Sequence, residues 1–144
     1  MVTLNPYLGF NGTCEVAFEL YKSVFGGQFL DLLRFKDIPS EQPIPKSEHN
    51  KIMHISLPIS NEVTLMGSDS MTCCGQSITC GDNVSIAISP ESEAQAKLIY
   101  NTLSAGGKIH IALDKTFWGA LFATFTDKFG ISWMINYQFE KEQN

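Results

Sequence analysis

Two stretches of the chain carry the apolar periodicity of an amphipathic helix. In residues 13–25 the pattern i, i+3, i+4, i+7 falls at Ala17, Leu20, Tyr21 and Val24, and further along it falls at Ala96, Ile99, Tyr100 and Leu103. A Gly-Gly pair follows each stretch, as is typical of a helix end. Before the second stretch, Ser89, Pro90 and Glu91 predict an N-cap, a proline at the first helical position and an acid in the first turn.

Short β-like runs flank both predicted helices in the same order. One run precedes each helix, at residues 7–10 and 84–88, and another follows it, at 29–35 and 108–113. Two further strands complete each unit, at 51–59 and 62–67 in the first and at 121–126 and 131–137 in the second. The sequence therefore predicts an α+β protein with two tandem βαβββ modules.

The stretches between these elements are polar and rich in turn residues. Residues 36–50 contain three prolines, and residues 68–83 are rich in Ser, Thr, Cys and Gly. We expect the first stretch to be a loop long enough to cover a site, and the second to connect the modules. The prediction is a single domain over 1–144, with module one at about 1–70, the connector at about 68–83 and module two at about 84–140.

Composition narrows the classes of function. The 144 residues are 44% hydrophobic and 17% charged, with a net charge of −5, which fits a compact domain with a sizeable core. Because there is no run of Lys or Arg, we expect no nucleic-acid partner. Without a long apolar segment or an export-type leader, we expect no membrane partner and a cytoplasmic location with reduced cysteines.

Several short motifs lie along the predicted strands, helices and turns. They are Pro6-Tyr7-Leu8, Asn11-Gly12, Phe18-Glu19-Leu20-Tyr21, Val24-Phe25-Gly26-Gly27, His54 within its strand, Gly67-Ser68-Asp69, Thr116-Phe117-Trp118-Gly119 and Thr126-Asp127-Lys128-Phe129-Gly130-Ile131-Ser132-Trp133-Met134-Ile135-Asn136. Together with the tandem modules, these motifs resemble the PhnB-like branch of the glyoxalase / bleomycin-resistance / extradiol-dioxygenase (vicinal oxygen chelate) superfamily. The resemblance covers nearly the whole chain, and its last segment, residues 126–136, is the most specific part.

This resemblance implies a glyoxalase-like fold, in which the two modules form an incomplete barrel or cup with helices outside, and a homodimer. The branch is often labelled demethylubiquinone methyltransferase. We discount that label because the sequence has no Gly-rich loop between a strand and a helix, nor the alternating pattern of a doubly wound parallel sheet.

The resemblance also implies a position for a divalent metal, held in metal-dependent relatives by His and Glu on matching strands of the two modules. At those places this sequence offers none of the strong ligands. We therefore predict no metal site of the usual kind and no cofactor. The available residues are Tyr7, Phe10, Asn83, Val84, Met134 and Asn136.

His54 and Asp69 are the candidate catalytic residues. His54 stands among the polar positions of an alternating strand, so it could face the cup and act as a general base or a hydrogen-bond donor, or it could bond within the sheet or reach solvent. Asp69 could orient His54 or accept a hydrogen bond from a ligand, and the alternative is that it caps a turn.

The candidate ligand contacts are mostly aromatic. Phe117 and Trp118 lie in a loop beside a glycine, where an indole can form a flat apolar wall with one N–H donor. Trp133 could point toward the ligand or pack in the core. Tyr7, Met66 and Ser68 complete the predicted ligand-binding set.

Two main functions are consistent with these residues. The first is a metal-free protein that binds a small, partly apolar molecule in the cup. The alternative is a lyase, an isomerase or another enzyme of the superfamily, with or without a divalent metal, that uses His54 as acid and base. A third possibility is an assembly module whose dimer surface is its function.

Overall fold

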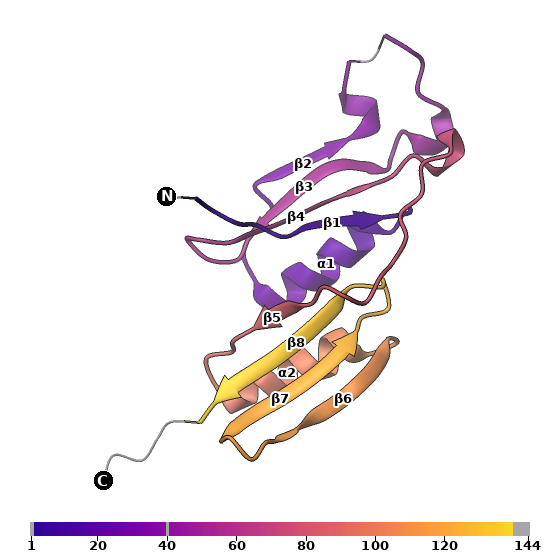
Figure 1. Cartoon of the computed structure of the whole chain (residues 1–144). Helices are drawn as coiled ribbons and strands as arrows, with labels where there is room; N and C mark the ends of the chain where they lie inside the picture. Colours follow the sequence, from indigo (N-terminus) through magenta and orange to yellow (C-terminus); the bar gives the residue numbers. More distant parts are fainter. Residues whose placement is uncertain (1, 40, 140–144) are drawn as a thin grey trace. The chain divides into compact units, whose positions relative to one another are not determined.

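The computed structural model describes residues 2–39 and 41–139, and the chain divides between Thr79 and Cys80 into two compact units, unit 1 and unit 2. Each unit contains one βαβββ module, so the α+β class and the tandem arrangement predicted from the sequence are confirmed (Figure 1). The elements are β1 (Tyr7–Phe10), α1 (Cys14–Phe25), β2 (Asp31–Arg34), β3 (Ile52–Pro58) and β4 (Thr64–Asp69), then β5 (Ile86–Ile88), α2 (Glu93–Ser104), β6 (Lys108–Lys115), β7 (Ala120–Thr126) and β8 (Ser132–Gln138).

Unit 1 is a four-stranded sheet with α1 packed on one face. The strand order is β1-β4-β3-β2, and β1 runs parallel to β4 while the other pairs are antiparallel. In β4 every second residue is buried, and Gly67 is one of these. A Cβ at Gly67 would lie 2.7 Å from the ring of Phe18 in α1, so only a glycine lets the helix pack this closely.

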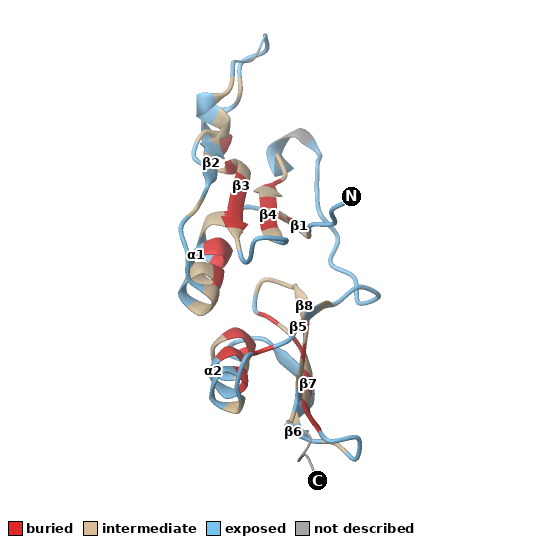
Figure 2. Ribbon diagram, turned by 90° about the vertical axis from the view of Figure 1, so that its left-hand side faces the viewer, coloured by how far each residue is buried: buried red, intermediate tan, exposed pale blue. Residues whose placement is uncertain are grey.

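Unit 2 repeats this architecture with the order β5-β8-β7-β6, and α2 covers one face of its sheet. Figure 2 shows the buried residues of both helices on the side that faces the sheet. Tyr100 of α2 meets Phe125 of β7 edge to face, with ring centroids 5.9 Å apart. Trp133 is the strand partner of Phe125 and is 1% exposed, so it belongs to the same buried layer.

The start of α2 differs from the prediction. The N-cap is Ser92, whose hydroxyl accepts a hydrogen bond from the N–H of Gln95 at 3.0 Å, and not Ser89. The side chain of Gln95 in turn accepts from the N–H of Glu91 at 2.6 Å. These two bonds satisfy the N–H groups of Gln95 and Glu91 and fix Ser92 as the cap of the helix.

Two segments between the strands contain short 3-10 turns, η2 (Lys46–Glu48) and η3 (Thr72–Cys74). Within the described residues, Cys14, Cys73 and Cys80 are not joined in disulfides. None of the helices in the described part of the chain has the length and apolar character needed to cross a membrane.

Candidate functional site

The side of the unit 1 sheet that is opposite α1 carries half of the predicted site residues, and we call it the open face. One line of strand partners crosses all four strands on this face, because Tyr7 pairs with Met66, Met66 with Ser56, and Ser56 with Asp31. Directly paired residues project to the same side of a sheet. His54 lies two positions before Ser56 in β3 and therefore shares the face.

His54 lies between two hydroxyl groups on the open face. Its Nδ1 is 3.2 Å from the Tyr7 hydroxyl, and its Nε2 is 3.4 Å from Ser56 Oγ. Ser56 Oγ donates to Asp31 Oδ2 at 3.2 Å. These four residues, Tyr7, His54, Ser56 and Asp31, form what we call the polar row. Sequence reasoning identified Tyr7 and His54 as site residues, and the structure brings them together.

Ser56 and Asp31 were not identified from the sequence. Ser56 shares the alternation of His54, so its face could have been found, but Asp31 lies in β2 and its pairing with Ser56 depends on the register of the β2–β3 hairpin. The register shifts between Leu33 and Arg34. No local pattern in the sequence marks that irregularity.

Apolar groups border the polar row. Tyr7 is 52% exposed. Leu33, the strand partner of His54, is 39% exposed. Met66 lies half-buried between Tyr7 and Ser56 in the line of strand partners. The open face therefore combines apolar surface with a few polar atoms, as small-molecule sites do.

Ile78 lies against the open face beside β1. A Cβ at Gly9 would be 2.9 Å from Ile78 Cδ1, so the absence of a side chain there makes room for Ile78. The side chain of Asn11 also binds the backbone of Ile78. Its Oδ1 accepts from the Ile78 N–H at 2.8 Å, and its Nδ2 donates to the Ile78 carbonyl at 2.9 Å. Ser68 is the strand partner of Gly9 and lies in this part of the face.

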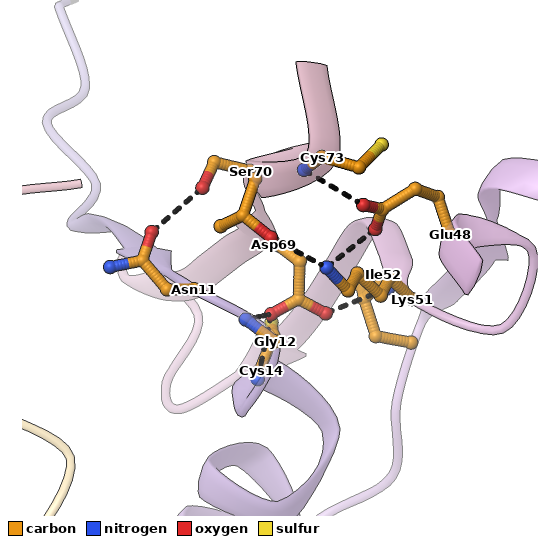
Figure 3. A network of polar contacts seen from close by, with 10 residues as sticks. Asn11, Gly12, Cys14, Glu48, Lys51, Ile52, Asp69, Ser70 and Cys73 are labelled. Atoms are coloured by element: carbon orange, nitrogen blue, oxygen red, sulfur yellow. Dashed lines mark hydrogen bonds and ion pairs between the residues drawn. The ribbon is translucent and has the colours of Figure 1, made fainter. Parts of the chain in front are cut away.

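Asp69, expected to orient His54 or contact a ligand, projects from the other side of the sheet. Its Oδ1 accepts from the N–H groups of Gly12 and Cys14 at 2.9 and 3.0 Å, and its Oδ2 accepts from the Ile52 N–H at 2.9 Å (Figure 3). The partners of His54 are Tyr7 and Ser56 instead. The carboxylate therefore satisfies free N–H groups at the start of α1 and fixes the start of β3.

A second buried carboxylate lies nearby in Figure 3. Glu48 is 1% exposed; its Oε1 accepts from the Cys73 N–H at 3.1 Å, and its Oε2 forms an ion pair with Lys51 at 2.5 Å. Hydrogen bonding from the Cys73 side chain, and then from Lys51, lowers the pKa of Glu48 to about 2. Lys51 also donates to Thr72, so this cluster joins η2 to η3.

The predicted contacts in unit 2 separate into two groups. Trp133, predicted to bind ligand, lies instead in the buried layer against α2. Phe117 and Trp118 lie in the turn between β6 and β7 and are 98% and 48% exposed. The Trp118 ring contacts Phe122 at 5.8 Å between centroids, and Phe122 is half-buried between two buried neighbours, so this contact is on the side opposite α2.

The donor set does not suit the divalent metal that the resemblance implies. On the open face the imidazole of His54 has hydroxyl neighbours, and the carboxylate of Asp69 is occupied by backbone N–H groups on the other side of the sheet. Within the described residues there is no cluster of three or more His, Cys, Asp or Glu side chains that could hold a metal ion. A divalent site of this superfamily needs imidazole and carboxylate ligands at one point.

The paired βαβββ units define a protein of the glyoxalase-like class, and comparison with known proteins agrees. The family model described as 3-demethylubiquinone-9 3-methyltransferase matches residues 3–136. Protein YjdN of Escherichia coli (strain K12) is 31% identical over 141 residues, which are 92% of this chain and 93% of that protein. The chain therefore belongs to the family that this model describes, and YjdN is a relative of it.

Two solved structures support the same fold. Protein PA1353 from Pseudomonas aeruginosa is 35% identical, with a TM-score of 0.85 over 97% of this chain and 100% of that chain. A PhnB protein from Bacillus cereus, described as a putative 3-demethylubiquinone-9 3-methyltransferase, is 20% identical, with a TM-score of 0.77 over 94% of this chain and 99% of that chain. The second likeness shows the fold alone, as do those to proteins described as belonging to the glyoxalase/bleomycin resistance group.

Proposed function

We propose that this protein binds a small, partly apolar molecule on the open face of unit 1, without the usual metal of the superfamily. The observation that carries the proposal is the position of His54, held between Tyr7 and Ser56 on a face that also offers apolar surface. Tyr7 and His54 orient polar atoms of the ligand, and Met66 contacts its apolar part. Ser68 lies beside them on the same face.

Phe117 and Trp118 remain predicted ligand contacts on unit 2. Their support is that both rings are exposed in one turn and that Trp118 packs on Phe122, which fixes the indole as a flat apolar surface. Trp118→Ala tests this prediction by itself, because loss of the indole should weaken a ligand that shifts the amides of this turn.

The experiment is a fragment screen on isotope-labelled protein, with amide chemical shifts as the readout. A ligand should shift the amides of Tyr7, His54 and Met66, and His54→Gln should weaken it about tenfold or more. His110→Gln is the matched control, because His110 is an exposed histidine bonded to Thr126 in unit 2. Equal affinity in both variants would contradict the proposal.

A second candidate is an enzyme in which His54 acts as acid and base. It is favoured by one observation, the 3.2 Å contact between the imidazole and the Tyr7 hydroxyl, which links two groups able to exchange a proton. An enzyme would convert a bound ligand in the wild type and leave it unchanged in His54→Gln. A ligand that is bound but never converted supports the binding protein.

Two further measurements test the proposed absence of a metal and the predicted homodimer. Elemental analysis of protein purified without chelator should find less than one divalent ion per chain, and one ion per chain would contradict the proposal of a metal-free protein. Sedimentation at micromolar concentration should give a species of twice the 16.0 kDa chain mass. Support for the dimer comes from the family alone.

A further inference from the structure

We infer that the polar row leaves the Tyr7 oxygen as a hydrogen-bond acceptor, so that the open face selects ligands that carry a hydroxyl or amino donor on an apolar body. This inference rests on the proposed function and specifies its ligand class. It also makes Ser56 and Asp31 positioning residues, which act through His54 and Tyr7.

The single hydroxyl proton of Ser56 determines the direction of the hydrogen bonds in the polar row. A serine hydroxyl has one O–H to donate and two lone pairs with which to accept. Ser56 Oγ uses its proton on Asp31 Oδ2, since a carboxylate oxygen only accepts. Toward His54 the serine oxygen is therefore an acceptor.

The tautomer of His54 follows from this. Nε2 lies 3.4 Å from Ser56 Oγ, and a hydrogen bond between them requires the proton on Nε2. In a neutral imidazole the other nitrogen then has a lone pair and accepts. Nδ1 faces the Tyr7 hydroxyl at 3.2 Å, so Tyr7 donates its proton to His54.

Tyr7 then has only lone pairs for a ligand. A phenol has one proton, and here that proton points to Nδ1. The residue is 52% exposed, so a small molecule can reach its ring and its oxygen. A ligand hydroxyl or amine can donate to that oxygen, whereas a carbonyl or carboxylate finds no proton there.

The negative charge at the end of the polar row favours the same class of ligand. Asp31 is exposed at the sheet edge and completes the row through Ser56. The negative charge of a carboxylate disfavours an anionic ligand nearby and tolerates a cationic one. Alcohols, phenols and amines with an apolar body are therefore the expected class, and carboxylic acids are disfavoured.

The first test measures the tautomer directly, by nitrogen-15 NMR of the histidine side chains at pH 8, with His54 assigned by loss of its signals in His54→Gln. The expected result is a neutral imidazole protonated on Nε2. Ser56→Ala removes the acceptor and should reduce the preference for Nε2, while Ser68→Ala, on the same face, should leave it unchanged. Protonation on Nδ1, alone or together with Nε2, overturns the inference.

The second test measures selectivity with two pairs of probes of matched shape. 4-Methylphenol should bind at least about fivefold more tightly than 4-methylanisole, which lacks the donor, and benzylamine more tightly than benzoate. Tyr7→Phe should remove the preference for the phenol by weakening 4-methylphenol alone. Equal binding of phenol and anisole, or tighter binding of benzoate, overturns the inferred ligand class.

The two tests separate the failure of this inference from that of the proposed function. An Nε2 tautomer without binding of any probe at millimolar concentration contradicts the proposed function for this ligand class, although the proton arrangement stands. Binding that depends on His54 but shows an Nδ1 tautomer, or no donor preference, keeps the proposed function and rejects the inference.

Discussion

The indole N–H of Trp133 donates to Asp127 Oδ2 at 2.8 Å, and both residues are buried. Asp127 Oδ1 accepts from the N–H groups of Phe129 and Ile131 at 2.9 and 3.0 Å. One carboxylate therefore closes the turn between β7 and β8 and anchors a large buried side chain of unit 2. The most specific segment of the family resemblance has a structural role here.

This relationship predicts different effects for the two tryptophans. Trp133→Phe leaves a cavity and removes the indole donor from the buried Asp127 carboxylate, and it should lower the free energy of unfolding by about 2–4 kcal/mol. Trp118→Phe, in the exposed turn, should change it by less than about 1 kcal/mol. Urea unfolding followed by circular dichroism measures both. Similar losses in the two variants would show that Trp133 is not the core residue.

Asp69 should be required for folding stability and not for the state of His54. Asp69→Asn replaces one oxygen with an amide that cannot accept, so at least one of three backbone N–H groups loses its partner. We expect a loss of about 2–4 kcal/mol, against less than about 0.5 kcal/mol for Asp82→Asn in the exposed connector. In the folded protein the tautomer of His54 should be unchanged. A changed tautomer would restore the orienting role of Asp69.

Glu48 should make stability depend on pH in the acid range. Its pKa falls from 4.5 to about 2 on folding, so the folded state favours the ionised form. The resulting stabilisation is fully present above pH 4.5 and is lost as the pH falls toward 2. Glu48→Gln should therefore be less stable than the wild type at pH 7, and the gap should narrow between pH 4.5 and 2.

The control for this pH dependence is Glu62→Gln, which changes an exposed acid. Its stability relative to the wild type should stay nearly constant across the same range. Unfolding in urea at a series of pH values gives both curves. A Glu48→Gln gap that stays constant down to pH 2 would contradict the lowered pKa.

Asn11 should hold Ile78 against the open face. Its side chain bonds both the N–H and the carbonyl of Ile78, in the manner of a strand partner. Asn11→Ala should raise hydrogen exchange of the Ile78 amide by about tenfold, because that amide loses its acceptor. Asn61→Ala, in the exposed turn before β4, is the control. Unchanged exchange at Ile78 in Asn11→Ala would show that other contacts retain the segment.

Most secondary structure was predictable because it depends on local periodicity. The run from Tyr7 to Phe10 is a strand with the predicted bounds, and the predicted helix over 13–25 begins one residue later, with Thr13 as its N-cap residue. The start of α2 was wrong by three residues, since Ser89 and Ser92 both have cap chemistry. The hydrogen bond from the Gln95 N–H to its hydroxyl distinguishes Ser92 as the cap.

The candidate site was predictable only in part. Alternation in β3 placed His54 among the polar positions of its strand but left its face open, and the neighbours of His54 come from strands far away in the sequence. The pairing of Tyr7 with Met66 and of Asp31 with Ser56 brings the polar row together. Asp69 was expected beside His54 but lies elsewhere. It follows Ser68 directly in β4, and successive side chains of a strand project to opposite faces of the sheet.

The sequence by itself determined the two modules, their helices and strands, and the apolar faces, because each of these follows from the spacing of residue types along a few turns or pleats. Only the tertiary structure decided which polar groups meet. In the folded chain Asp69 is hydrogen-bonded to backbone N–H groups near the starts of α1 and β3. Trp133 is bonded to Asp127, and His54 to Tyr7 and Ser56. Hydrogen bonds of this kind depend on strand register and on burial, which no local pattern encodes.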